Sequence, residues 1–140
     1  MSGAAVTNRA PIMLYDGVCA LCNGAVAFAL RRDRRGELRF AALQGQTAAE
    51  LVTRHPQLAA EDTMVWVDPG GRVSIRSDAA LALGLYLGGV WGFWASAARI
   101  IPRPVRDLAY GLVARVRYRA CGRYAACPVP PKEHRSRFLN

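Results

Sequence analysis

Two cysteines separated by two residues, Cys19 and Cys22, are the residues of this sequence best suited to chemistry. They follow a short apolar stretch, residues 11–15, and an Asp16-Gly17 turn, and they begin an apolar helical pattern. Unpaired backbone N–H groups and the helix dipole favour a thiolate at a helix N-terminus. The spacing predicts dithiol–disulfide exchange, in which Cys19 is the attacking nucleophile and Cys22 the resolving thiol that releases the substrate.

Asp16 lies three residues before Cys19, and its carboxyl group has two interpretations. It can move a proton to or from Cys22 as a general acid and base. Alternatively, its carboxylate accepts backbone hydrogen bonds around Gly17 in an Asx-type turn. The two roles are compatible, so both stay open.

The cysteine pair has a metal-binding alternative. A zinc site needs a second pair of ligands, usually with two to four residues between them. Cys121 and Cys127 have five residues between them, and His134 is the remaining nearby candidate. We therefore expect no metal and no cofactor, and keep a metal-binding thiol domain as an alternative.

The elements that must position the pair follow one another in a recognisable order. An apolar run predicts a strand at 11–15, alternation predicts one at 38–41, and two β-rich runs around a Gly/Pro turn predict a hairpin at 63–67 and 72–76. Helical patterns predict helices at 19–35, 47–55 and 79–87. The order β-α-β-α-β-β-α is that of a thioredoxin-like α/β fold, a mixed sheet with helices on its faces. Further helices extend this core on its C-terminal side.

Residues 79–98 contain no charged side chain and are long enough to span a bilayer. Glycines interrupt the run, and Gly88-Gly89 predicts a break between two helices, the second carrying Trp91, Phe93 and Trp94. We expect a buried helical pair, with a membrane span and a membrane-surface contact as alternatives. A last helix, from Val105 to Arg119, has an apolar face made of Leu108, Leu112, Val113 and Val116.

The composition indicates one folded domain. The chain has 140 residues, of which 52% are hydrophobic and 21% charged. We expect a flexible tail at residues 1–10, the domain at 11–121 and an extended tail at 122–140. The net charge of +9 favours acidic partners, nucleic acid or anionic lipid, but no recognisable motif indicates specific nucleic-acid binding.

No apolar segment follows Arg9 in the way a secretory signal requires, so we expect a cytoplasmic protein, with membrane association left open. In that compartment thiols rest reduced, and a cysteine pair is more often catalytic or metal-binding than structural.

Residues 16–24, Asp-Gly-Val-Cys-Ala-Leu-Cys-Asn-Gly, resemble the signature of the DCC family of predicted thiol-disulfide oxidoreductases, named for its Asp, Cys and Cys. Later segments resemble the family as well: residues 31–36, 40–41, Gln44, 77–79, 102–107, Tyr110, 117–119, 122–123, Cys127 and 137–139. The resemblance covers residues 11–139. It implies a small thioredoxin-like protein that makes, breaks or shuffles disulfides in a protein or small-molecule substrate using Cys19 and Cys22.

The sequence departs from the wider thioredoxin group before the third strand. The cis-proline usual there is missing, and we expect Thr63 or Met64 to face the cysteine pair and contact substrate instead. Ser77-Asp78 resembles the place where related folds hold the γ-glutamyl end of glutathione, and helix capping is the alternative.

The function predicted is therefore a thiol-disulfide oxidoreductase. The alternative from another class is a non-catalytic module that binds a membrane or a membrane protein through residues 84–104 and the arginine-rich surface.

Overall fold

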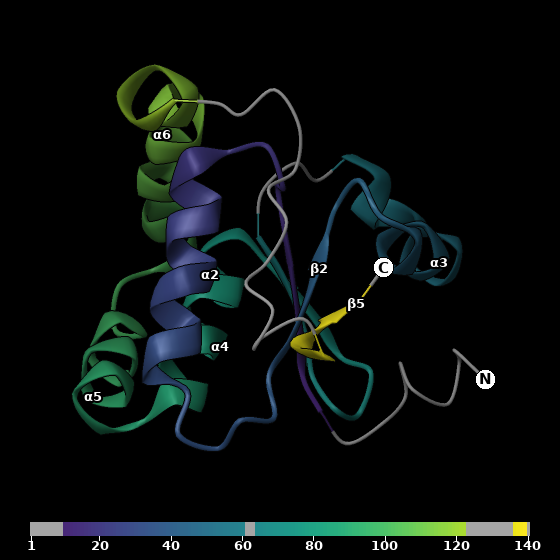
Figure 1. Ribbon diagram of the computed structural model, residues 1–140. Helices are drawn as coiled ribbons and strands as arrows, with labels where there is room; N and C mark the ends of the chain where they lie inside the picture. Colours follow the sequence, from purple (N-terminus) through teal and green to yellow (C-terminus); the bar gives the residue numbers. More distant parts are fainter. Residues whose placement is uncertain (1–9, 61–63, 123–135, 140) are drawn as a thin grey trace.

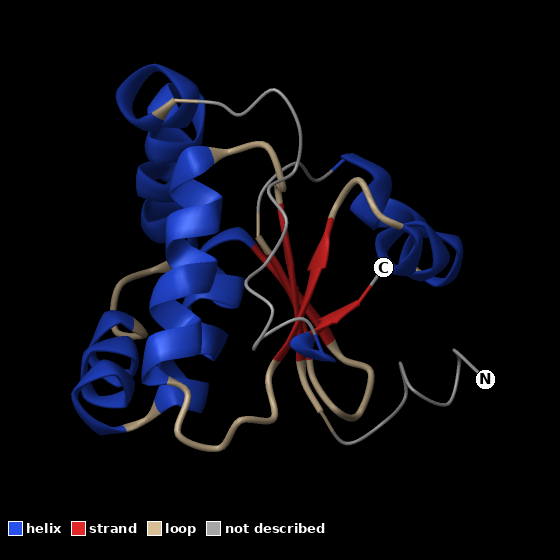
Figure 2. Ribbon diagram, in the orientation of Figure 1, coloured by secondary structure: helices blue, strands red, loops and turns tan. Residues whose placement is uncertain are grey.

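The structure, a computed structural model, describes residues 10–60, 64–122 and 136–139. A central sheet lies between helices on its two faces (Figures 1 and 2). The elements are, in chain order, β1 (Ile12–Tyr15), α2 (Ala20–Arg32), β2 (Arg39–Ala42), α3 (Gln46–Arg54), the 3-10 helix η1 (Pro56–Ala60), β3 (Val65–Val67), β4 (Val73–Ile75), α4 (Arg76–Leu87), α5 (Gly89–Ala98), α6 (Arg103–Cys121) and β5 (Phe138–Leu139).

The five strands form a mixed sheet in the order β4-β3-β1-β2-β5. β1 and β2 are parallel, with Tyr15 opposite Ala42, whereas β3 runs antiparallel to β1 and β4 antiparallel to β3. The predicted β-α-β-α-β-β-α order and the α/β class are confirmed, and the arrangement is compatible with a thioredoxin-like fold. Because β1 and β2 are parallel neighbours, the loops that follow them meet at one edge of the sheet.

The core is divided by the sheet into two clusters. Side chains alternate along each strand, so Met13 points to one face while Ile12 and Leu14 point to the other. Met13 packs with Phe40 and Trp66 beneath α2 and α4. The other face is covered by α3 and η1, and Figure 1 shows α5 and α6 on the same side as α2 and α4.

The expectation of a buried apolar helical pair is wrong for α5, and the expected apolar face of α6 is not buried either. Phe93 and Trp94 are 64% and 60% exposed, and Leu108 is 67% exposed. The sheet face is already covered by α2 and α4, so α5 and α6 form an outer layer. Periodicity identified the apolar side of α6 correctly, but it did not predict that this side faces solvent.

The expected alternative of a membrane span finds no candidate. Among the residues that the structure describes, none of the helices has both the length and the apolar character needed to cross a bilayer.

The predicted break between α4 and α5 is confirmed at Gly88 and Gly89. Their φ angles are +69° and +58°, a left-handed conformation that glycine adopts without a steric penalty. The turn folds α5 back against α4 at Gly84, where a Cβ would lie 2.8 Å from the Cβ of Ala95.

Replacing Gly84 by alanine is expected to destabilise the protein, because α5 must shift to accommodate the added methyl group. We expect a loss of about 1–3 kcal/mol in the free energy of unfolding, measured by chemical denaturation. Gly111→Ala is the matched control, since nothing lies within 4 Å of a Cβ built there in α6. It should raise stability by up to about 1 kcal/mol through helix propensity. Equal effects at the two glycines would contradict the close α4–α5 contact.

The last described residues belong to the sheet. β5 pairs in parallel with β2, and Phe138 stacks on Phe40 with ring centroids 5.3 Å apart. The preceding Arg137 forms an ion pair with Asp33, the C-cap residue of α2. The stretch expected to be an extended tail therefore ends in an ordered strand.

Asp33 is the centre of a hydrogen-bond network that joins the C-terminal end of α2 to α4 and to the residue before β5. Its side chain is completely buried, and its two oxygen atoms accept hydrogen bonds from the Tyr86 hydroxyl, from Arg137 and from three backbone N–H groups. The pKa of Tyr86 is raised to about 12, mainly by burial and then by its hydrogen bond to Asp33.

Candidate active site

The cysteine pair lies where β1 leads into α2. Cys19 is the N-cap residue of α2, and its Sγ accepts a hydrogen bond of 3.3 Å from the backbone N–H of Cys22. An N-cap side chain normally satisfies such an N–H with oxygen; here a sulfur does so. The same contact favours a negative charge on that sulfur.

The two thiols are reduced, and their surroundings differ. Cys19 is completely buried, with 0% of its surface exposed, while Cys22 is partly exposed. Burial raises the pKa of the Cys22 thiol to about 12, aided by its hydrogen bond to Cys19 and by the charge of Cys19, and to a lesser extent by the charge of Asp16. Cys22 is therefore protonated at neutral pH.

Asp16 is buried beside the pair and closes an Asx turn. Its Oδ1 accepts hydrogen bonds from the backbone N–H of Val18 at 3.2 Å and from the Gln44 side-chain amide at 2.8 Å. The turn interpretation of Asp16 is therefore confirmed. Its charge also raises the pKa of Cys22, so the carboxylate lies close enough to act on that thiol.

Two residues of the site had no role assigned from the sequence. Gln44 bridges the Asp16-Gly17 turn, since its Oε1 also accepts the N–H of Gly17 at 3.0 Å. The Asn23 amide donates to the carbonyls of Gly17 and Cys19 at 2.8 and 2.9 Å. The parallel pairing of β1 and β2 brings Gln44 to this turn, because it places the loop after β1 beside the loop after β2.

Gln44→Ala is expected to loosen the Asp16-Gly17 turn, because it removes one donor and one acceptor. Each lost hydrogen bond contributes about 1 kcal/mol to stability. We also expect the pH profile of Cys22 alkylation to shift, because Asp16 loses the donor that orients it. Gln57→Ala, at an exposed position in η1, is the matched control and should change neither quantity. An unchanged pH profile in Gln44→Ala would show that the bridge does not influence the thiols.

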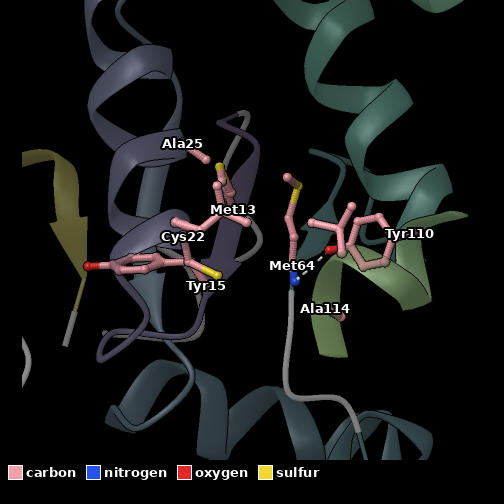
Figure 3. A pocket seen from close by; sticks show the side chains of 9 residues that line it. Met13, Tyr15, Cys22, Ala25, Met64, Tyr110 and Ala114 are labelled. Carbon is pink, nitrogen blue, oxygen red and sulfur yellow. Dashed lines mark hydrogen bonds between the residues drawn. The ribbon is translucent and has the colours of Figure 1, made fainter. Parts of the chain in front are cut away.

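An apolar pocket of about 140 Å³ opens beside Cys22, between α2 and α6 (Figure 3). Its walls include Met13, Tyr15, Cys22, Ala25, Met64 and Tyr110. The Tyr110 hydroxyl accepts a hydrogen bond of 3.2 Å from the backbone N–H of Met64 and so ties α6 to the start of β3. Cys22 thus faces a space suited to an apolar group.

The other predicted contact residues are placed differently. Met64 lines the pocket, whereas Thr63, Cys127 and His134 lie outside the described residues, as does the side chain of Cys121. Within the described ranges, no group of three metal-ligating side chains occurs.

Ser77 and Asp78 connect α4 to α6. Ser77 donates a hydrogen bond to Asp107, and Asp78 pairs with Arg103 and Arg106 at 3.1 and 3.0 Å. The capping interpretation is wrong, because α4 begins at Arg76 and its N-cap, Ile75, makes no side-chain capping bond. A contact of this pair with glutathione stays a prediction.

The mixed sheet is compatible with a thioredoxin-like fold, and the two cysteines lie at the N-terminus of α2. This combination is typical of thiol-disulfide redox proteins. The chain belongs to the DCC1-like thiol-disulfide oxidoreductase family, whose sequence model matches residues 13–123. Membership supports a thiol-disulfide redox role.

Two relatives extend the comparison. The chain is 34% identical over 140 residues to the uncharacterized protein YuxK of Bacillus subtilis (strain 168), covering 99% of each chain. It is 36% identical over 120 residues to the chloroplastic DCC family protein At1g52590 of Arabidopsis thaliana, covering 86% of this chain and 70% of that one. No solved structure matches the chain.

Proposed function

We propose that this protein is a thiol-disulfide oxidoreductase in which Cys19 attacks and Cys22 resolves. The supporting observation is the position of the Cys19 sulfur at the N-cap, where it accepts the N–H of Cys22. Attack by the Cys19 thiolate on a substrate disulfide forms a mixed disulfide and releases one substrate thiolate. Cys22 then loses its proton and attacks the Cys19 sulfur. This step forms the disulfide between Cys19 and Cys22 and frees the second substrate thiol. Two electrons pass to the substrate, and the reverse sequence oxidises a dithiol.

The raised pKa of Cys22 gives the two steps their order. Hydrogen bonding to Cys19 and the charge of Cys19 both contribute to that pKa, and the mixed disulfide removes the charge. The pKa of Cys22 therefore falls once the mixed disulfide has formed, which is the stage at which Cys22 must lose its proton. Asp16, whose charge acts on Cys22, is the group we assign to receive and relay the proton.

The pocket beside Cys22 supports a substrate with an apolar group next to its reactive sulfur. A dry cavity of about 150 Å³ holds a benzene ring, so this pocket suits an aromatic or branched side chain of a protein substrate. A small apolar disulfide meets the same requirement. Glutathione is one donor to assay, although Ser77 and Asp78 are engaged with α6.

Redox titration of the full chain, followed by acid trapping and mass spectrometry, tests this proposal. We expect a reversible disulfide between Cys19 and Cys22 and reduction of insulin by the dithiol form. An absence of that disulfide across the titration would refute the proposed function.

Alkylation as a function of pH tests the assignment of the two thiols. The proposal requires the buried Cys19 to become accessible to reagents, and iodoacetamide should then modify it before Cys22 at neutral pH, because Cys22 is protonated there. Below its pKa, the thiolate fraction of Cys22 rises about tenfold per pH unit, so its modification should increase steadily toward pH 12. Faster modification of Cys22 at neutral pH would reverse the assigned roles.

A further inference from the structure

Helix α6 has its polar side facing the protein and its apolar side facing outward. Toward α4, Arg106 binds Asp78 and Asp107 binds Ser77, while Tyr110 binds the backbone of Met64. On the opposite side, Val105, Leu108, Leu112 and Val116 recur every three or four residues and are all exposed. A helix that packs only onto its own domain shows the reverse arrangement.

The exposed apolar side chains continue along the chain from α6 into α5. Ile100, which is 85% exposed, and Ile101 connect the two helices. On α5, Phe93 and Trp94 are exposed and their rings contact each other, with centroids 5.4 Å apart. We call the exposed apolar side chains of α5, of its connection and of α6 the outer apolar face. Monomeric globular proteins rarely expose apolar surface this extensive unless it binds something.

Arginine side chains border the outer apolar face. Arg31, Arg32 and Arg34 line a hollow of about 310 Å³ together with Val90 and Trp91 at the start of α5. This end of α5 is therefore positively charged.

The other end of the outer apolar face is positively charged too. On α6, Arg115 and Arg119 each follow a residue of the apolar stripe by three positions and are exposed. The single acidic residue of α6, Asp107, faces inward. A positively charged border around aromatic and aliphatic side chains is the composition of helices that lie at an anionic membrane interface.

We propose that the outer apolar face binds the surface of a bilayer containing anionic phospholipid. The apolar side chains of α5 and α6 enter the boundary between headgroups and acyl chains, while the arginines contact lipid phosphates. Charge complementarity selects this occupant over a second copy of the chain. Symmetric association would bring arginine-bordered surfaces together, and like charges disfavour that contact.

Vesicle flotation of the full chain tests the proposal. We expect the protein to float with vesicles of phosphatidylcholine and phosphatidylglycerol, to remain unbound with phosphatidylcholine alone, and to lose affinity as salt is raised. Phe93→Ser combined with Trp94→Ser should weaken binding by about tenfold or more, since it removes two large apolar side chains. Phe93→Leu with Trp94→Leu should retain most of the binding.

A pair of charge-matched variants tests the role of the arginines. Arg115→Gln with Arg119→Gln should lower affinity for the anionic vesicles and flatten its salt dependence. Arg54→Gln with Arg72→Gln removes the same charge from α3 and from the β3–β4 turn, and should lower affinity much less.

Three results would overturn the proposal. The first is a failure to float with anionic vesicles. The second is equal binding to neutral and anionic vesicles, which would remove the role of the arginines. The third is a protein that does not bind vesicles but forms a concentration-dependent dimer in sedimentation, which Phe93→Ser with Trp94→Ser abolishes. That result would assign the outer apolar face to a second copy of the chain.

Discussion

Cys19→Ser is expected to abolish disulfide reduction, with a loss of rate on the order of a thousandfold or more, because the hydroxyl cannot supply the attacking thiolate. The reduction of insulin or of a peptide disulfide measures this loss. The hydrogen bond from the Cys22 N–H can still be accepted by the serine oxygen, so the N-cap and the fold should persist. Thermal unfolding and circular dichroism check that they do.

Cys22→Ser is the partner variant and should behave differently. Because Cys19 can still attack, a mixed disulfide between Cys19 and the substrate should accumulate and be visible by mass spectrometry. Substantial turnover by Cys19→Ser, together with trapping on Cys22, would contradict the assigned order. In that case the partly exposed thiol would be the nucleophile.

Asp33→Ala is expected to have the largest effect on stability, about 3–5 kcal/mol, because removing one partner of a buried ion pair leaves the other without compensation. Arg137 loses its ion pair, and the Tyr86 hydroxyl and the N–H of Leu38 lose an acceptor. Chemical denaturation measures the loss. The pKa of Tyr86 should also fall, because its hydrogen bond to Asp33 is one of the causes that raise it.

Glu37→Ala is the matched control for Asp33→Ala. It removes the same charge from an exposed position four residues further on, and should change stability by less than about 0.5 kcal/mol. Similar losses in both variants would show that the Asp33 network does not hold the C-terminal strand in place.

Much of the fold was predictable because its signals are local. The continuous apolar run of β1, the hairpin of β3 and β4, and the glycines at 88 and 89 are each recognisable from neighbouring residues in the sequence. Strand β5 is different. Two residues have no periodicity, and Phe138–Leu139 becomes a strand only through pairing with β2, about a hundred positions earlier.

The site shows the same division between local and non-local signals. The Cys19–Cys22 spacing and the Asp16 turn are visible in the sequence, and the structure places both at the start of α2. The bridge from Gln44 depends on sheet pairing, so the sequence alone could not predict it. The orientation of α6 was unpredictable for a further reason. Its polar side chains find partners on α4, and those contacts decide which side faces solvent.

The position of β5 also bears on how the chain folds. The residues that cover Asp33 and add the outer strand beside β2 lie about a hundred positions after their partners, so joining them costs the entropy of closing a long loop. Until that loop closes, the edge of β2 is unpaired on this side and the Asp33 carboxylate lacks its ion pair with Arg137. We therefore expect this edge of the sheet to form late in folding, after the elements held by local contacts.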